Sequence, residues 1–264
     1  MCIRDSYRRV LDSDVSAVLL CHTDPKTDVA IAALQAGKHL LIEKPVCFSL
    51  QEIDAMIAAQ TSGLVAQAAY VKVYEPGFEM AQKEVRSMED IRLVQINHFH
   101  PNNRLHLKQL DLKHFTDHPK GSLEPASEKR HAACRQAIGE VDEQLERAFY
   151  LVTGSMIHDL YTLRVMVGRP SQVISAEFWR EGRAVTITLG LPNGARCVAT
   201  WVDLPDLWDF YETLEIYGDA KRVVLAYPTG FARGIPCTLT VQGIDETGRS
   251  SHTKPCLLYT SDAA

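Results

Sequence analysis

The chain has 264 residues, of which 46% are hydrophobic and 23% charged, and its formal net charge is −5. The acidic balance gives no reason to expect nucleic acid or an anionic membrane as a partner, because both select basic surfaces, and no apolar run approaches the roughly 18 residues that a transmembrane helix needs. Seven cysteines without C-x-x-C spacing indicate neither a zinc site nor a thioredoxin-type motif, and their odd number favours a reducing, cytoplasmic compartment.

Both ends of the chain resemble translated adaptor sequence. We therefore expect residues 1–6 and 256–264 to be non-native and exclude them from the fold prediction. The alternative is a native terminus without regular structure.

The first third of the chain alternates short apolar runs with helical patterns. Residues 15–20 and 39–42 are predicted as buried strands, and residues 64–69 as a further strand. Residues 27–36 between them are alanine-rich and helical, with Gly37 at the helix end, and Ser49 begins a helix with a capping box completed by Glu52. Strand–helix–strand–helix–strand at this spacing predicts a parallel sheet with right-handed crossovers, the α/β architecture of a Rossmann domain, over residues 7–70.

After Tyr70 the pattern changes to that of an antiparallel sheet. Residues 184–191 alternate strictly between apolar and polar side chains, and Asn193-Gly194 is a strong hairpin signal before the return strand 195–201. We expect an α+β domain over residues 71–255 with an open antiparallel sheet. Its other elements are a charged, mainly loop-like insert at 101–147 with some helix near 140–150, a helix at 155–167, and strands at 172–178, 213–217, 223–226 and 238–242.

Ligands of open parallel sheets bind beyond the carboxyl ends of the strands. The residues at those positions are the run Cys21, His22 and Thr23, the tripeptide Glu43-Lys44-Pro45, and Lys72. Lys44 is of chemical interest because desolvation at the end of a buried strand makes a lysine easier to deprotonate. From spacing alone, a solvated loop lysine explains Lys44 equally well.

Three segments carry a family resemblance. Residues 33–45, which end in Glu43-Lys44-Pro45, residues 70–78, and the pattern Ile157-His158-Asp159 closing at Gly168 resemble the glucose-fructose oxidoreductase / inositol dehydrogenase / rhizopine catabolism family, Gfo/Idh/MocA. The resemblance covers roughly residues 7–245.

The resemblance implies a dehydrogenase that transfers a hydride between NAD or NADP and a CH–OH carbon of a sugar, inositol or related polyol. It implies that Lys44 contacts substrate and cofactor, that His158 is the acid/base, and that Lys72 and Asp159 contact substrate. The cofactor would lie against Cys21, His22, Thr23, Glu43, Lys44 and Pro45. It also implies a homodimer or homotetramer formed through the antiparallel sheet.

His158 passes one test that does not depend on the resemblance. It lies two residues from Met156, about 200° around a helix, and so points away from the apolar stripe of that helix. A surface histidine at the helix start is the alternative.

The chain departs from the family pattern at the position four residues before His158. Many members have an aspartate there, where this chain has Gly154, so the carboxylate that would orient the histidine is absent unless Asp159 replaces it. Val73 replaces a frequent arginine, and Lys26 lies where a histidine is usual. These changes leave a second hypothesis, a non-catalytic regulator that senses a sugar or nucleotide on the same scaffold.

The sequence contains no G-x-G-x-x-G turn, with which a dinucleotide-binding domain begins. We therefore expect an N-terminally truncated fragment that lacks two strand–helix units, about 60 residues, and that binds cofactor poorly by itself.

His98 and His100 are expected on the same face of one strand, because side chains alternate there. A transition-metal site is one interpretation. A polar strand that runs into a solvated insert is the other, and on it we expect no metal site.

Overall fold

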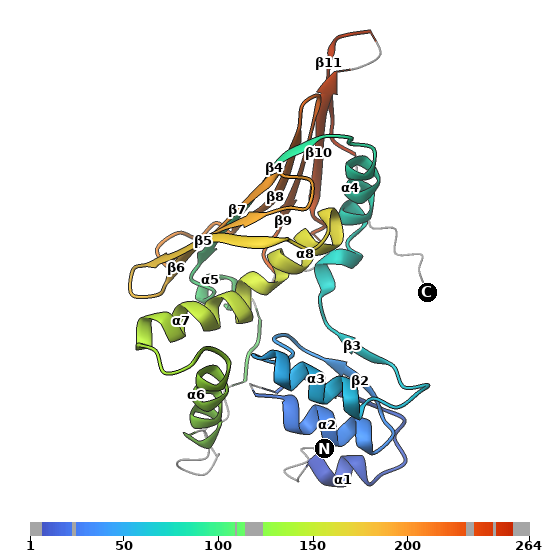
Figure 1. Cartoon of the computed structure of the whole chain (residues 1–264), viewed down its shortest axis with the longest axis vertical. Helices are drawn as coiled ribbons and strands as arrows, with labels where there is room; N and C mark the ends of the chain where they lie inside the picture. Colours follow the sequence, from blue (N-terminus) through green and yellow to red (C-terminus); the bar gives the residue numbers. More distant parts are fainter. Residues whose placement is uncertain are drawn as a thin grey trace. The chain divides into compact units, whose positions relative to one another are not determined.

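The computed structural model (Figure 1) describes residues 7–22, 25–108, 110–113, 124–230, 235–244 and 247–255. The chain divides into two compact units. The first comprises Met1–Tyr70 with Phe115–Asp142, and the second Val71–His114 with Glu143–Ala264. Each is described by itself.

The first unit contains a parallel sheet in the order β1-β2-β3. Its strands are β1 (Ala17–Leu20), β2 (His39–Ile42) and β3 (Ala66–Ala68). The helices α1 (Tyr7–Leu11), α2 (Thr27–Gln35) and α3 (Leu50–Ala59) belong to the same unit. The predicted strand–helix alternation and its parallel pairing are therefore confirmed.

Local sequence signals set the ends of these helices as predicted. Gly37 follows α2 with φ +69°, a conformation that side chains with a Cβ rarely adopt. Ser49 caps α3, accepting from the backbone N–H of Glu52 while the Glu52 side chain accepts from that of Ser49. The Glu52 carboxylate also accepts from Thr27 Oγ1 at 2.6 Å and so joins α3 to the start of α2.

The prediction that β1 is a buried strand was wrong for most of its length. Leu20 is 6% exposed, but Leu19 is 58% exposed and Val15, just before the strand, 39%. Leu41, opposite Leu19 on the central strand β2, is also 39% exposed, whereas Leu20 and Ile42 on the other face are buried. One face of this sheet is therefore left uncovered by the described residues of its own unit.

The second unit is built on an eight-stranded sheet in the order β11-β10-β9-β8-β4-β7-β6-β5. All pairings are antiparallel except that of β4 with β7, which is parallel. The strands are β4 (Ile91–Pro101), β5 (Gln172–Trp179), β6 (Ala184–Gly190), β7 (Arg196–Leu204), β8 (Tyr211–Gly218), β9 (Lys221–Tyr227), β10 (Thr238–Ile244) and β11 (Ser250–Thr253).

The predicted hairpin joins β6 to β7. Gly194 has φ +86°, and the backbone N–H of Leu191 donates to the carbonyl of Ala195 at 3.0 Å. The open antiparallel sheet is thus confirmed, with one parallel pair at its centre.

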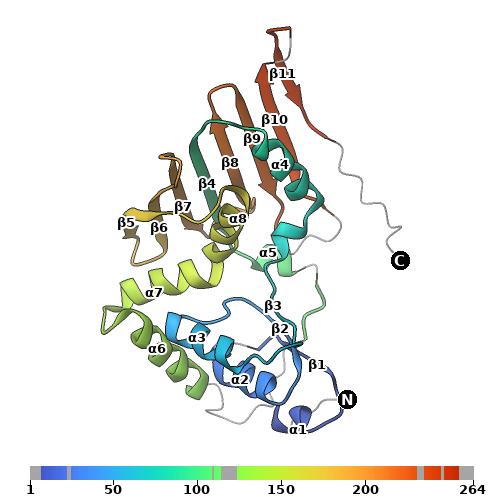
Figure 2. The same ribbon diagram turned by 45° about the vertical axis from the view of Figure 1, so that its right-hand side comes forward.

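Helices cover one face of this sheet (Figure 2). After the short helix η1 (Val71–Tyr74), the helix α4 (Pro76–Arg86) contributes buried Phe78, and α8 (Ile157–Val167) contributes buried Leu163 to the same core. A π-helical turn, η2 (Val152–Met156), precedes α8. The predicted helix 155–167 therefore continues an earlier helix and does not begin at residue 155.

The insert is more helical than expected. It contains α5 (Arg104–Leu107), α6 (Glu124–Ile138) and α7 (Glu143–Leu151), whereas we expected helix only near 140–150. Its many charged side chains give α6 a weak apolar stripe, although Cys134 in that helix is 1% exposed. The apolar periodicity of the sequence therefore did not indicate the helix α6.

Candidate active site

Lys44 lies just beyond the carboxyl end of β2, as predicted. The backbone N–H of Glu43 still donates to the Leu20 carbonyl of β1 at 2.9 Å, and the Glu43 carboxylate accepts from the backbone N–H of Lys44 at 3.1 Å. Lys44 is half-buried and is joined to buried Pro45 by a cis peptide bond. The backbone that presents Lys44 is thus an extension of the sheet.

Lys26 contacts the same segment, although no role was predicted for it. Its side chain is buried, with the residue 3% exposed, and Nζ donates to the Pro45 carbonyl at 3.4 Å. A buried ammonium requires polar partners. We therefore regard Lys26 as a residue that positions the Glu43-Lys44-Pro45 segment.

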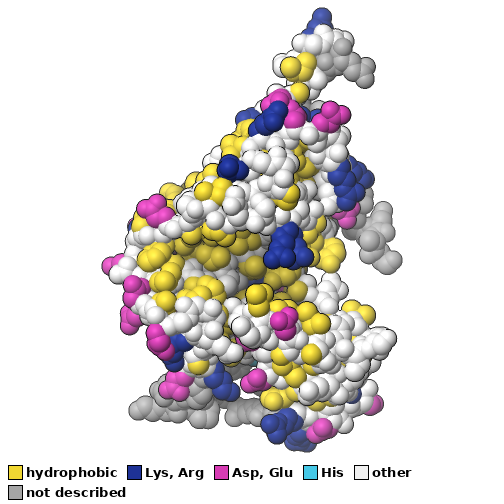
Figure 3. All heavy atoms as spheres, viewed as in Figure 1, with side chains coloured by type: hydrophobic (Ala, Val, Ile, Leu, Met, Phe, Trp, Pro, Cys, Tyr) yellow, Lys and Arg dark blue, Asp and Glu magenta, His cyan; other side chains and the backbone are white. Residues whose placement is uncertain are grey.

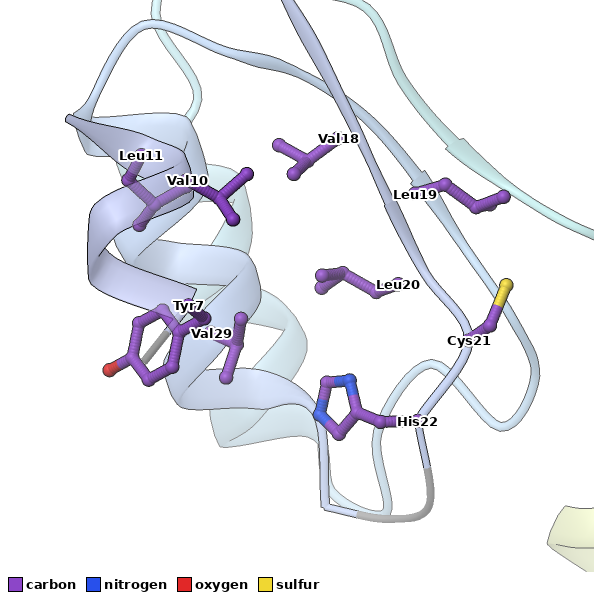
Figure 4. Close-up of a pocket in the computed structure, with 9 residues that line it drawn as sticks. All are labelled: Tyr7, Val10, Leu11, Val18, Leu19, Leu20, Cys21, His22 and Val29. Atoms are coloured by element: carbon purple, nitrogen blue, oxygen red, sulfur yellow. The ribbon is translucent and has the colours of Figure 1, made fainter. Parts of the chain in front are cut away.

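Cys21 and His22, the residues expected near cofactor, are exposed at the end of β1. Both line a hollow of about 380 Å³ whose other walls are mainly aliphatic side chains of α1 and β1 (Figure 4). Thr23, predicted with them, lies outside the described residues.

His158 and Asp159 occupy the first turn of α8 in the second unit. His158 is half-buried, whereas Asp159 is only 3% exposed. The Asp159 carboxylate (Oδ2) lies 2.8 Å from Nδ1 of His98 on β4. The carboxylate that was considered as a partner for His158 therefore contacts a different histidine.

His98 belongs to a polar row that crosses the helix-covered face of the sheet. In the strand register His98 is opposite Trp201 of β7 and Glu212 of β8, and Glu212 is opposite Tyr227 of β9. The two preceding rows on this face are apolar. They consist of Val94, Cys197, Ile216 and Val223, and of Ile96, Ala199, Leu214 and Leu225.

Charged side chains converge on this row. Lys72 of η1 forms a salt bridge with Glu212 Oε1, and its Nζ lies 5.1 Å from the ring centroid of Tyr227. His98 Nδ1 is 4.0 Å from the same Glu212 oxygen. The Lys72 and Glu212 side chains are 18% and 1% exposed. We call His98, Asp159, Glu212 and Lys72 the buried charged cluster.

Two polar atoms at the cluster have no hydrogen-bond partner among the described residues, Glu212 Oε2 and the Tyr227 hydroxyl. Burial, followed by the charges of Cys237, Asp159 and Glu75, raises the pKa of Tyr227 well above its ordinary value. The Tyr227 hydroxyl therefore stays protonated, and its buried O–H lacks an acceptor, which is costly.

His100 extends the network from the cluster. Its Nδ1 lies 3.4 Å from Nε2 of His98, and its Nε2 lies 3.1 Å from Nδ2 of Asn103. The His100 ring stacks on Trp201, with centroids 5.5 Å apart. The expectation that His98 and His100 share a face is confirmed.

The structure thus brings two predicted substrate-binding residues, Lys72 and Asp159, to one buried cluster in the second unit. Lys44 belongs to the first unit. Sequence reasoning missed Glu212 and Tyr227, whose only signal was a charged or hydroxylated residue at an inward position of a strand.

The comparisons with known proteins bear on the first unit most directly. Residues 4–70 match the sequence model of an oxidoreductase family with an NAD-binding Rossmann fold, GFO_IDH_MocA. Over these residues the chain is similar to the Gfo/Idh/MocA oxidoreductase family. The matched segment includes the Glu43-Lys44-Pro45 tripeptide.

Curated relatives match a similar length. The uncharacterized oxidoreductase YrbE of Bacillus subtilis (strain 168) is 32% identical over 90 residues, 33% of this chain and 26% of the relative. The scyllo-inositol 2-dehydrogenase (NAD(+)) of the same organism is 26% identical over 87 residues, 32% of this chain and 25% of the relative. Each alignment therefore spans about a quarter of the relative.

Solved structures share the fold of nearly the whole chain. Levoglucosan dehydrogenase in complex with NADH and L-sorbose matches with a TM-score of 0.67 at 18% identity, over 95% of this chain and 63% of that one. UDP-N-acetylglucosamine 3-dehydrogenase GnnA from Acidithiobacillus ferrooxidans matches with a TM-score of 0.64 at 18% identity, over 96% of this chain and 68% of that one. At this identity the likeness extends to the fold alone.

No helix in the described part of the chain is long and apolar enough to cross a membrane.

Proposed function

We propose that this protein is an NAD(P)-dependent dehydrogenase that oxidises a CH–OH carbon of a sugar, inositol or related polyol. The observation that carries the proposal is the place of Lys44, directly after β2 inside the segment that matches the NAD-binding family. The relative that is a scyllo-inositol 2-dehydrogenase and the neighbour that is a levoglucosan dehydrogenase support the substrate class.

The residues at the strand ends of the first unit suit a nicotinamide cofactor. Exposed Cys21 and His22 follow β1, and half-buried Lys44 follows β2. These are the positions beyond a parallel sheet where nucleotides bind. NAD or NADP would supply hydride chemistry there when bound. Glu43 and Pro45 would hold the Lys44 backbone against it.

Oxidation of an alcohol also requires the hydroxyl proton to leave. In the proposal His158 accepts that proton as general base. The Lys44 ammonium stabilises the negative charge that develops on the substrate oxygen. Lys72 and Asp159 belong to the substrate side, which means that they would contact the substrate. The buried charged cluster fixes both side chains.

Assembly through the eight-stranded sheet completes the proposal. The face of the sheet opposite α4 and α8 bears half-buried polar side chains, among which Asn97 Nδ2 donates to Thr213 Oγ1 at 3.0 Å and to Glu215 Oε1 at 3.3 Å. Such a face suits a homodimer or homotetramer. A cytoplasmic location fits the five free cysteines among the described residues.

The test uses protein from the complete gene and follows cofactor reduction at 340 nm with NAD and NADP over a panel of sugars, inositols and polyols. We expect activity with one of these classes. Lys44→Ala and His158→Ala are each expected to lower kcat by about 10²–10⁴-fold. Lys83→Ala, which removes an exposed lysine of α4, is the matched control and should retain wild-type activity.

Two results would contradict the proposal. Cofactor binding without turnover of any substrate would favour the regulator that senses a sugar or nucleotide. Full activity of both variants would exclude Lys44 and His158 from the chemistry.

A further inference from the structure

We propose that His98, Asp159 and Glu212 form a binding site for one divalent transition-metal ion, and that Lys72 is the cation that competes for it. One nitrogen or oxygen donor from each of the three residues lies within 4.8 Å of the other two, and all three residues are buried. Lys72 and Asp159 also belong to the substrate side of the proposed function, but metal binding is measured without any dehydrogenase turnover and so can fail or succeed separately.

The donor geometry is close to that of a bound ion. First-row metal ions bind imidazole nitrogen and carboxylate oxygen at about 2.0–2.2 Å, which puts pairs of ligand atoms roughly 3–4.4 Å apart. Here His98 Nδ1 lies 2.8 Å from Asp159 Oδ2 and 4.0 Å from Glu212 Oε1. Small side-chain rotations therefore suffice to place all three around one ion. Imidazole with carboxylates suits zinc, iron or manganese.

Unsatisfied polar atoms are the second observation. Glu212 Oε2 has no hydrogen-bond partner among the described residues, although its side chain is only 1% exposed. The buried Tyr227 hydroxyl also lacks an acceptor in that part of the chain. A metal ion would satisfy the carboxylate, and a water on that ion would give the hydroxyl an acceptor.

Charge balance leads to the same site. Asp159 and Glu212 bring two negative charges, and Lys72 brings one positive charge. Buried charges are tolerated only when they are balanced, so the cluster needs one more positive charge. A divalent ion with Lys72 withdrawn gives neutrality. Lys72 can withdraw because its side chain is 18% exposed and therefore reaches solvent.

The His98–His100 contact gives the proposed ligand an outer partner. A metal on His98 Nδ1 leaves the ring proton on Nε2, which lies 3.4 Å from His100 Nδ1. That nitrogen accepts when His100 carries its own proton on Nε2 and the Asn103 amide turns its oxygen toward it. Metal-bound histidines commonly donate their second N–H to such an outer partner. The other titratable groups near the cluster are Tyr227, Cys237 and Glu75.

Metal binding should therefore displace the Lys72 ammonium from Glu212. Removing the Lys72 charge should raise affinity, an effect opposite to that expected for an ordinary structural lysine.

The test titrates the chelator-treated full chain with Zn²⁺ by calorimetry, and with Co²⁺ by visible absorption. We expect one site per chain, with tetrahedral or five-coordinate Co²⁺ bands. Asp159→Asn and Glu212→Gln should weaken binding at least about 10-fold, and Lys72→Met should strengthen it by a similar factor. His252→Ala removes an exposed histidine of β11 and should leave binding unchanged.

Folding of each variant is checked by near-ultraviolet circular dichroism. Absence of Zn²⁺ binding to the wild-type chain at millimolar concentration would overturn the proposal. So would binding that His252→Ala abolishes, that Glu212→Gln leaves intact, or that Lys72→Met weakens.

Discussion

The two candidate regions differ in what makes them recognisable. Lys44 lies at an exposed sheet end, in a segment marked by a sequence motif and held by backbone contacts to Glu43 and Lys26. The buried charged cluster has no continuous motif, and its members come from η1, β4, α8 and β8. A motif identifies chemistry that is local in sequence, whereas the cluster exists only once the strand register is set.

The surroundings of the two regions differ as well. Apolar side chains gather in the second unit where Figure 1 draws β5 and α8 (Figure 3). The edge strand β5 leaves Val173 and Ile174 66% and 45% exposed. The polar row with the cluster lies within an otherwise apolar sheet face. We therefore expect the cluster to affect stability strongly and Lys44 to affect it little.

The largest predicted effect follows from breaking the cluster. Asp159→Ala removes the buried carboxylate that lies 2.8 Å from His98 Nδ1 and leaves that ring nitrogen without this partner. We expect a loss of about 2–3 kcal/mol in the free energy of unfolding of the second unit. All three tryptophans, Trp179, Trp201 and Trp208, belong to that unit, so urea unfolding followed by tryptophan fluorescence measures it selectively.

Lys44→Ala is the matched comparison, and it should change the same transition by less than about 0.5 kcal/mol. If Asp159→Ala lowers the free energy of unfolding as little as Lys44→Ala does, the buried contacts of the cluster do not stabilise the second unit. The expected difference in stability effect between the two regions would then be wrong.

The sequence predicted what depends on short-range patterns. The β2 strand, the α3 capping box and the Asn193-Gly194 hairpin were found because each is specified within about ten residues. Alternation also predicted that His98 and His100 share a face. Their partners Glu212 and Tyr227 could not be predicted, because they lie more than 110 positions away from His98 along the chain and a one-residue slip in register would reverse every side chain.

Errors arose where burial depends on distant neighbours. Leu19 has the composition of a core strand but is 58% exposed on the edge strand β1. The helix α6 was assigned to loop, because its charged residues obscure the apolar period, whereas α7 was expected near residues 140–150.

A smaller effect is expected at the capping box of the first unit. Ser49→Ala removes the acceptor for the Glu52 backbone N–H, which lies 3.2 Å from the Ser49 hydroxyl. We expect the free energy of unfolding of this unit to fall by about 1 kcal/mol. Faster hydrogen exchange of the α3 amides would report it, while the tryptophan transition of the second unit should not move. A shift of both would contradict the independent response of the two units.

The smallest effect concerns thiol reactivity, and it separates the two regions without altering either. Cys21 is exposed at the end of β1, whereas burial raises the pKa of Cys197 in β7 to about 12. At pH 8 the thiolate fraction of Cys197 is therefore on the order of one in ten thousand, and the thiolate is the reactive form. Iodoacetamide should label Cys21 within minutes and Cys197 only when the sheet opens, as measured by mass spectrometry of peptides. Cys21→Ser provides the control for total labelling.

Raising the pH toward 10 should increase the thiolate fraction of Cys197 about 100-fold yet leave it protected, because access through the sheet limits its reaction. Labelling of Cys197 that rises in proportion to its thiolate fraction would show that this part of the sheet is open to solvent. The expected contrast between exposed Cys21, on the cofactor side, and Cys197, in a closed sheet core, would then be wrong.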